Sequence, residues 1–377
     1  MSNTKKLFTA ALAMYVFINV LFVLKYGLRV LSPAMAVACT AFYAAVIVCL
    51  VCLSARLWKQ FGGRVRQHFK LWHVYTGVLI VLIVLIVLQM RIDPYSLQVD
   101  RWSAIHNFLG NMLRGDYPYA AQTHLGGYGS PFPVWQMVHL PFYLLGNVGL
   151  SFAVCALMYF DGCRRLFGLW RAVAAFMLLV ASPAFLYEVC VRSDLLTNFL
   201  FVAALVMFLF RRRVDFQRHY LLLAVVTALV ASTRLSAAIP LAIFLFPAFI
   251  RSGLRRQVVF VLLVAAVFVL TFLPFVFWDS DMLFFFEYNP FVLQTRQGHV
   301  ADLVVLAVFG VWMALQWKGC FVRFSFAVSV CLMALVVVTF AHNMWQDNSW
   351  NQLFESLYDI SYFNMALPFV ILCLRRV

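Results

Sequence analysis

Residues Arg91–Gly146 read RIDPYSLQVDRWSAIHNFLGNMLRGDYPYAAQTHLGGYGSPFPVWQMVHLPFYLLG, and this stretch decides the fold. It follows a continuous apolar run, Leu71–Met90, and it holds carboxylates, arginines and a part rich in glycine and proline. Charged side chains and irregular backbone are costly in a bilayer core. The sequence therefore predicts an extracytoplasmic loop over residues 91–133. The short apolar segment Pro133–Leu145 then dips into the outer leaflet.

One helix is expected inside this loop, starting at Asp100. Its apolar residues recur at intervals of three and four: Trp102, Ile105, Phe108, Leu109 and Met112. That spacing places them on one helical face and leaves the other face polar. An amphipathic helix of this kind is predicted to lie along the membrane surface rather than to cross it.

The composition of the whole chain indicates an integral membrane protein. The 377 residues are 65% hydrophobic and only 11% charged, and the mean hydropathy is +0.92. Spans of such a chain must be helical, because the bilayer offers backbone groups no water to bond. We therefore expect an all-α bundle of transmembrane helices, a single integral membrane domain over residues 1–377.

The net charge of +15 is explained by basic residues concentrated in the loops on one side of the membrane. Most of the Lys and Arg residues fall in loops that alternate with loops carrying the acids, and among the acids only Asp161 and Asp215 fall on the basic side. We assign the basic loops to the cytoplasm, so the charge gives no reason to expect nucleic acid as a partner.

With the basic loops inside, the apolar runs make about 12 crossings and both termini are cytoplasmic. The predicted crossings are Leu7–Leu24, Ala34–Leu53, Leu71–Met90, Val148–Cys163, Arg171–Val189, Asp194–Phe210, His219–Thr233, Leu235–Ile250, Gln257–Phe275, Ala301–Trp317, Val322–Ala341 and Tyr358–Leu374.

The cysteines and histidines show no metal-ligand spacing. Most of the nine cysteines lie inside apolar runs, where thiols act as small hydrophobic side chains. We predict neither a metal nor another cofactor.

Two acids with neighbouring arginines stand at expected helix starts on the outer face. Asp100 is followed by Arg101, and Asp194 follows Arg192 and precedes a long apolar run. Acids at such positions cap helices and stabilise their N-termini. Ionisable groups at membrane depth also mark functional sites, so both interpretations stay open.

Two further groups could recognise a substrate. Arg234 lies between two apolar runs on the outer face, where it either extends to water or binds an anion such as a phosphate. Gln294 and Arg296 belong to the loop Asn289–His299, whose amides and cation suit sugar hydroxyls but also suit solvent.

Taken in order, these motifs resemble the GT-C superfamily of membrane glycosyltransferases, which includes polyprenyl-phosphate-dependent mannosyltransferases and the lipid A aminoarabinose transferase. The matching motifs are an outer-loop Asp that opens an amphipathic helix, Gly-Asp-Tyr-Pro-Tyr, Tyr-Gly-Ser-Pro-Phe-Pro, Ser-Pro-Ala-Phe, Arg-Ser-Asp-Leu-Leu-Thr-Asn-Phe and Thr-Arg-Leu-Ser. The resemblance covers residues 100–240. It departs from the family in two additional N-terminal crossings and in the spacing of Pro131 and Pro133.

The resemblance implies inverting transfer of a hexose, such as mannose, from a polyprenyl-phosphate donor to an extracytoplasmic lipid, glycan or protein. It implies that Asp100 and Asp194 are catalytic, with Asp100 as the general base. Arg234 would stabilise the charge on the leaving phosphate. The residues expected to bind substrate are Arg101, Arg192, Arg234, Tyr119, His124, Tyr128, Gln294 and Arg296.

Two other classes of membrane protein remain open. A transporter or flippase of lipid-linked sugars also combines many helices with a few buried charges. It usually shows internal repeats, and none is visible here. A polysaccharide polymerase or ligase would share the site but move a preassembled chain. In each case we expect a plasma-, inner- or ER-type membrane and a site on the extracytoplasmic face.

Overall fold

The computed structural model describes residues 3–354 and 358–374 as a helical bundle, and within these ranges it contains no β-strand. Five helices are long and apolar enough to cross a membrane. They are α1 (Asn3–Gly27), α2 (Pro33–His68), α3 (Leu71–Met90), α13 (Leu254–Trp278) and α17 (Phe321–Gln346). A membrane-embedded helical bundle, as predicted, is therefore confirmed.

A sixth candidate span is a bent pair. Helices α8 (Leu169–Val180) and α9 (Pro183–Cys190) meet at an angle of 67°. Ser182 caps α9, because its hydroxyl accepts the backbone N–H of Phe185, and Pro183 opens the helix at the position where its missing N–H costs nothing. The predicted crossing Arg171–Val189 is thus two helices with a sharp turn between them.

The remaining apolar helices are shorter than a typical span. They are α7 (Ser151–Phe167), α10 (Leu195–Arg211), α11 (Phe216–Ala231), α12 (Ala238–Phe249) with the 3₁₀ turn η4 (Leu235–Ala237) before it, α16 (Val300–Gln316) and α18 (Leu367–Cys373). The predicted crossing Tyr358–Leu374 is not one continuous helix. It consists of the 3₁₀ segment η6 (Ile360–Met365) followed by α18, where Pro368 takes an early helical position.

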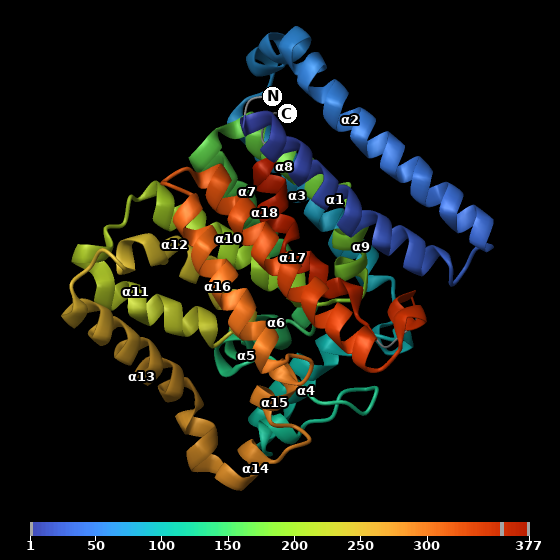
Figure 1. Cartoon of the computed structure of the whole chain (residues 1–377). Coiled ribbons are helices and arrows are strands. Elements are labelled where there is room, and N and C mark those ends of the chain that lie inside the picture. The colour runs from blue at the N-terminus through green and yellow to red at the C-terminus, as the bar shows by residue number, and fades with distance from the viewer. Residues whose placement is uncertain (1–2, 355–357, 375–377) are drawn as a thin grey trace.

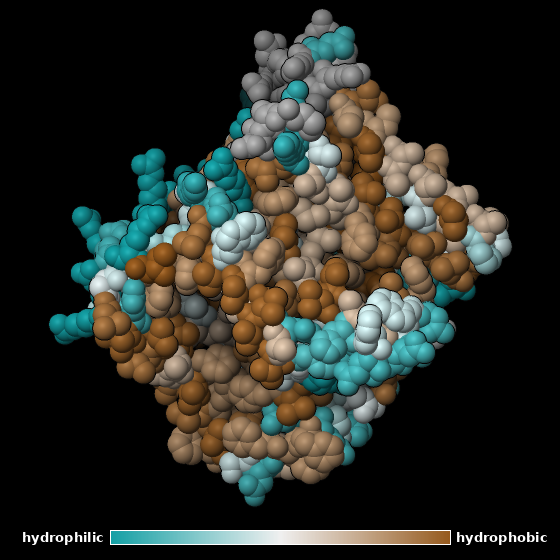
Figure 2. All heavy atoms as spheres, viewed as in Figure 1, coloured by the Kyte–Doolittle hydropathy of each residue, from teal (hydrophilic) through white to brown (hydrophobic). Residues whose placement is uncertain are grey.

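Helix α10 runs through the centre of the bundle (Figure 1) and is buried along most of its length. It packs against α7, α18 and η6, while α1 packs against α2 and α18. The start of α1 and the end of α18 lie at the same end of the bundle in this view. In Figure 2, hydrophobic side chains form a broad band, and hydrophilic side chains gather along the left edge and over the loops at the lower right.

The short elements outside the long helices form the loops. They are η1 (Pro94–Ser96), α4 (Arg101–Arg114), η2 (Pro118–Ala120), α5 (Pro133–Val138), α6 (Leu140–Leu144), η3 (Val148–Leu150), α14 (Ser280–Phe284), α15 (Pro290–Thr295) and η5 (Trp350–Phe354). Neither α5 nor α6 is long enough to cross a bilayer, in keeping with the predicted dip.

The predicted amphipathic helix is α4, and Asp100 is its N-cap residue. Its apolar face packs on protein rather than being free to face lipid. Phe108 lies 5.7 Å from Phe275 of α13, measured between ring centroids, and Trp102, Ile105 and Leu109 are also buried. The loop therefore shares an apolar cluster with the end of α13.

The sidedness of the bundle can be tested at two exposed positions, Leu125 in the loop after α4 and Arg212 after α10. A cysteine in place of Leu125 should react with a membrane-impermeant maleimide in intact cells. A cysteine in place of Arg212 should react only after the membrane is permeabilised, because basic loops are retained in the cytoplasm. The wild-type chain supplies the background from its native cysteines. Labelling of position 212 alone in intact cells would reverse the assigned orientation.

Candidate active site

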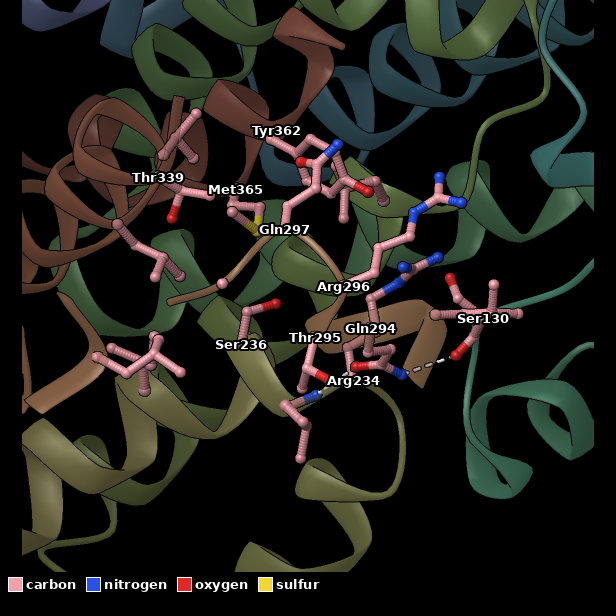
Figure 3. Close-up of a pocket in the computed structure, with 18 of the residues that line it drawn as sticks. Ser130, Arg234, Ser236, Gln294, Thr295, Arg296, Gln297, Thr339, Tyr362 and Met365 are labelled. Carbon is pink, nitrogen blue, oxygen red and sulfur yellow. Dashed lines mark hydrogen bonds between the residues drawn. The ribbon is translucent and has the colours of Figure 1, made fainter. Parts of the chain in front are cut away.

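A cavity of about 310 Å³ lies where α10 and α12 begin, beside the segment that links α15 to α16 (Figure 3). Helix α17 and the segment η6 complete its wall. Its polar lining residues are Ser130, Arg234, Ser236, Gln294, Thr295, Arg296, Gln297, Thr339 and Tyr362. Arg234, Gln294 and Arg296, which were predicted to bind substrate, therefore meet at one cavity.

Arg234 is held in the wall by a buried ion pair. One of its terminal nitrogens, Nη2, lies 2.6 Å from Oδ2 of Asp194, and the side chains of Arg234 and Asp194 are 8% and 2% exposed. The same Oδ2 accepts a hydrogen bond of 2.8 Å from the indole N–H of Trp135. Asp194 therefore stands behind Arg234 and fixes the orientation of the guanidinium, rather than lining the cavity itself.

Hydrogen-bonding capacity remains on both members of this pair. Oδ1 of Asp194 and Nε of Arg234 are buried, and among the described residues neither has a partner. Buried polar atoms in native proteins are almost always hydrogen-bonded. The pair is therefore buried with one acceptor and one donor position unused by the described residues.

Gln294 joins three segments of the cavity. Its Oε1 accepts the backbone N–H of Leu235 at 2.9 Å, and its Nε2 donates to the backbone carbonyl of Ser130 at 2.7 Å. Both polar ends of this side chain are thus used to hold the outer loop against the start of η4. The role of Gln294 is to shape the cavity.

Arg296 is a second cation at the cavity. Arg296 is exposed to solvent, and it forms no ion pair with any described residue. In Figure 3 the side chains of Arg234 and Arg296 extend toward the same edge of the cavity. An anion bound there would meet one fixed and one adjustable guanidinium.

Asp100 lies close to this site but outside its lining. Its Oδ2 accepts a hydrogen bond of 2.8 Å from the Thr123 hydroxyl. The chain at Gly127 passes so near that a Cβ there would lie 3.0 Å from the same oxygen. Among the described residues, no hydrogen bond or ion pair joins Asp100 to Asp194. The two carboxylates therefore do not interact directly, as they would in the simplest form of a catalytic pair.

Arg101 connects the Asp100 region to the cavity. Its Nη2 lies 2.7 Å from Oδ2 of Asp359, and its guanidinium lies 5.0 Å above the ring centre of Tyr362. Burial lowers the pKa of Arg101, but the carboxylate of Asp359, with smaller contributions from Tyr362, Glu188 and Asp194, raises this pKa above its ordinary value. Arg101 thus stays charged. It forms an ion pair with Asp359 and is also attracted electrostatically by Glu188 and Asp194.

Four of the predicted binding residues have structural contacts away from the cavity. Arg192 has a left-handed backbone (φ 54°) and donates to the carbonyls of Gln89 and Ile92 at the end of α3. Tyr119 is buried in the apolar cluster under α4. His124 bonds the Ser103 hydroxyl and the Leu97 carbonyl. The hydroxyl of Tyr128 accepts a hydrogen bond from Gln122. None of the four is among the residues that line the cavity.

Sequence reasoning missed Glu188, Asp359 and Tyr362. The carboxylate of Glu188 is buried and accepts hydrogen bonds from the side chain of Asn364 and from the backbone N–H of Leu196. An acid inside the predicted crossing Arg171–Val189 was an available signal. No spacing in the sequence pointed to Tyr362, because its position depends on the turn between η6 and α18.

An apolar groove of about 330 Å³ adjoins the cavity. It lies between α12, α16 and α17, and it shares Ile239, Leu303 and Leu335 with the cavity wall. Gly310 of α16 also lines the groove, and a Cβ at Gly310 would meet no atom within 4 Å. The cavity, whose lining mixes two arginines with apolar side chains, and the apolar groove are therefore direct neighbours.

Residues 3–354 and 358–374 contain no cluster of three potential metal-ligating side chains. Comparisons of the sequence with protein-family models and with curated proteins, and of the structure with solved structures, give no match.

Proposed function

We propose that this chain is a membrane glycosyltransferase of the GT-C type, which transfers a hexose such as mannose from a polyprenyl-phosphate donor to an extracytoplasmic lipid, glycan or protein. The observation that carries the proposal is that the cavity, which has two arginines, shares three apolar lining residues with an apolar groove between α12, α16 and α17. A lipid-linked phosphosugar likewise joins a polar, charged phosphosugar to an apolar prenyl chain. The proposal includes twelve crossings, in which the shorter helices also pass through the bilayer.

Each part of the donor has a matching part of the site. Guanidinium groups bind phosphate through a planar fork of donors, so Arg234 and Arg296 would hold the donor phosphate. The prenyl chain would lie along Ile239, Leu303 and Leu335 into the groove. Asp194 would keep Arg234 charged and aligned, a role that replaces the direct catalytic one expected from the sequence.

The proposed reaction is a single displacement at the anomeric carbon. The oxygen of the acceptor hydroxyl forms a bond to that carbon, while the bond from the carbon to the phosphate oxygen breaks and the polyprenyl phosphate leaves. Asp100 accepts the hydroxyl proton as general base. Arg234 and Arg296 stabilise the charge that develops on the leaving phosphate.

Groove and cavity can be tested separately with Gly310→Leu. The added side chain would fill part of the groove, since a Cβ at Gly310 has open space around it. Burial is worth about 0.8 kcal/mol per CH₂ group, so losing two such contacts weakens binding about tenfold. Affinity of the purified protein for a long-chain polyprenyl phosphate should fall by at least this factor, while affinity for geranyl phosphate changes little.

Gly77→Leu is the matched control, because Gly77 is also an interior helical glycine with open space around it but lies in α3. It should leave both affinities unchanged. Equal affinity of wild type and Gly310→Leu for the long-chain lipid would remove the groove from the proposal. Movement of a radiolabelled polyprenyl-phosphate hexose across vesicles in unchanged chemical form, without transfer to an acceptor, would instead favour a transporter.

A further inference from the structure

The wall of the cavity opposite Ser236 is made by η6, a short 3₁₀ segment held by polar contacts from other helices. The carboxylate of Asp359 caps its start by accepting the backbone N–H of Ser361, and the same residue is paired to Arg101 of α4. At the other end, Asn364 donates to the buried carboxylate of Glu188 at 2.9 Å. Both ends of η6 are therefore fixed by charged side chains.

Between these anchors, η6 directs Tyr362 into the cavity. Tyr362 lines the cavity and lies beside Gln297 in Figure 3. Arg101 lies 5.0 Å over this ring but is not a lining residue of the cavity. The guanidinium thus covers one face of a ring whose residue lines the cavity. The ring of Phe340, which also lines the cavity, contacts Tyr362 with centroids 6.4 Å apart and planes at 82°.

The electrostatics favour a fixed ring. A guanidinium over an aromatic face is attracted by the negative charge of the π-system. Arg101 cannot move away without leaving Asp359, and its side chain is only 14% exposed. Among the described residues, the hydroxyl of Tyr362 forms no hydrogen bond, so it is available to a ligand in the cavity.

We propose that Tyr362 is the sugar-binding platform of the cavity, on which the hexose ring lies against the aromatic face, and that Arg101 and Asp359 are its positioning residues. This inference rests on the proposed function, since it assumes a lipid-phosphate sugar as ligand. It assigns the sugar to the side of Tyr362, Gln297 and Thr339, and the phosphate to the side of Arg234 and Arg296. Rigid aromatic groups give contact area at low entropic cost, which suits an apolar sugar face.

The test compares two lipids, a polyprenyl phosphate and the same lipid carrying a hexose. The sugar should add affinity in the wild type, and Tyr362→Leu should remove about two- to tenfold of it, the size expected for one aromatic contact. Affinity for the sugar-free lipid should stay unchanged. Tyr362→Phe keeps the ring and should lose only the part contributed by the hydroxyl. Tyr95→Leu, at an exposed tyrosine in the outer loop, is the control and should alter neither affinity.

The positioning residues are tested by Asp359→Asn and Arg101→Lys. Both should reduce the affinity increment from the sugar without altering binding of the sugar-free lipid. The exposed pair Arg114–Asp116 at the end of the same helix provides the matched control, Asp116→Asn, in which Asp116 lies just past the helix and the change should have no effect. A change in melting temperature with an intact sugar increment would show that the Arg101–Asp359 pair is only structural.

The results separate this inference from the proposed function. Failure of the wild type to bind polyprenyl phosphate would defeat the proposed function. Binding of both lipids with an unchanged sugar increment in Tyr362→Leu would defeat only the assignment of the platform.

Discussion

Replacing Arg234 with alanine should destabilise the folded protein by about 3–5 kcal/mol, because it leaves the carboxylate of Asp194 buried without its counter-ion. The Asp194 side chain is 2% exposed, so solvent screens this ion pair little in the intact protein. The Trp135 indole would be its remaining hydrogen-bond donor among the described side chains. The measurement is the unfolding of the purified protein in detergent, followed by tryptophan fluorescence.

Stability and binding can be separated with the double variant Arg234→Leu/Asp194→Leu. Replacing both members of a buried pair with apolar groups is often neutral, so stability should largely return. Affinity for polyprenyl phosphate should not return, because a lost charge-assisted contact costs about 1.5–3 kcal/mol, or one to two decades in affinity. Arg165→Ala, in a half-exposed ion pair of α7, should cost far less stability. Recovery of lipid affinity in the double variant would show that Arg234 serves only the fold.

Replacing Asp100 with asparagine should lower turnover by about 10²–10⁴, the contribution of a positioned general base. The amide oxygen can still accept the hydrogen bond of the Thr123 hydroxyl, so the loop should keep its structure. The measurement is the initial rate of transfer from a radiolabelled polyprenyl-phosphate hexose, with the melting temperature determined in parallel.

Asp93→Asn is the matched control for this variant. Asp93 lies in the same loop and also begins a short helix, where its carboxylate accepts the backbone N–H of Tyr95. Its replacement should leave the rate near that of wild type. Equal losses in the two variants, or full activity of Asp100→Asn, would remove Asp100 from the reaction.

The elements with a strong local signal could be predicted from the sequence. The spacing of Trp102, Ile105 and Phe108 predicted α4, and the structure places this helix at Arg101–Arg114. Long apolar runs predicted α1, α3, α13 and α17. Length alone could not fix the number of crossings, because a helix such as α10 is buried in the bundle and its hydrophobicity reflects packing as well as lipid.

The candidate site could be predicted only as a list of residues. Arg234 and Asp194 were both selected, but their pairing depends on how α10 and α12 pack, which no spacing reveals. Arg192 was also selected as a binding residue. The structure places its side chain at the carbonyls of Gln89 and Ile92 near the end of α3, and it is not among the residues that line the cavity.

The buried apolar residues form two clusters, one beneath α4 and one around α10, which are expected to open with different free energies. Phe108 and Trp135 belong to the cluster beneath α4, which is separate from the main core around α10. Proteins open in contiguous units whose opening free energies differ, and a small cluster opens more readily than a large one. The cluster beneath α4 also includes Phe272 and Phe275 of α13, so opening of the outer loop would uncover the last turns of that helix as well.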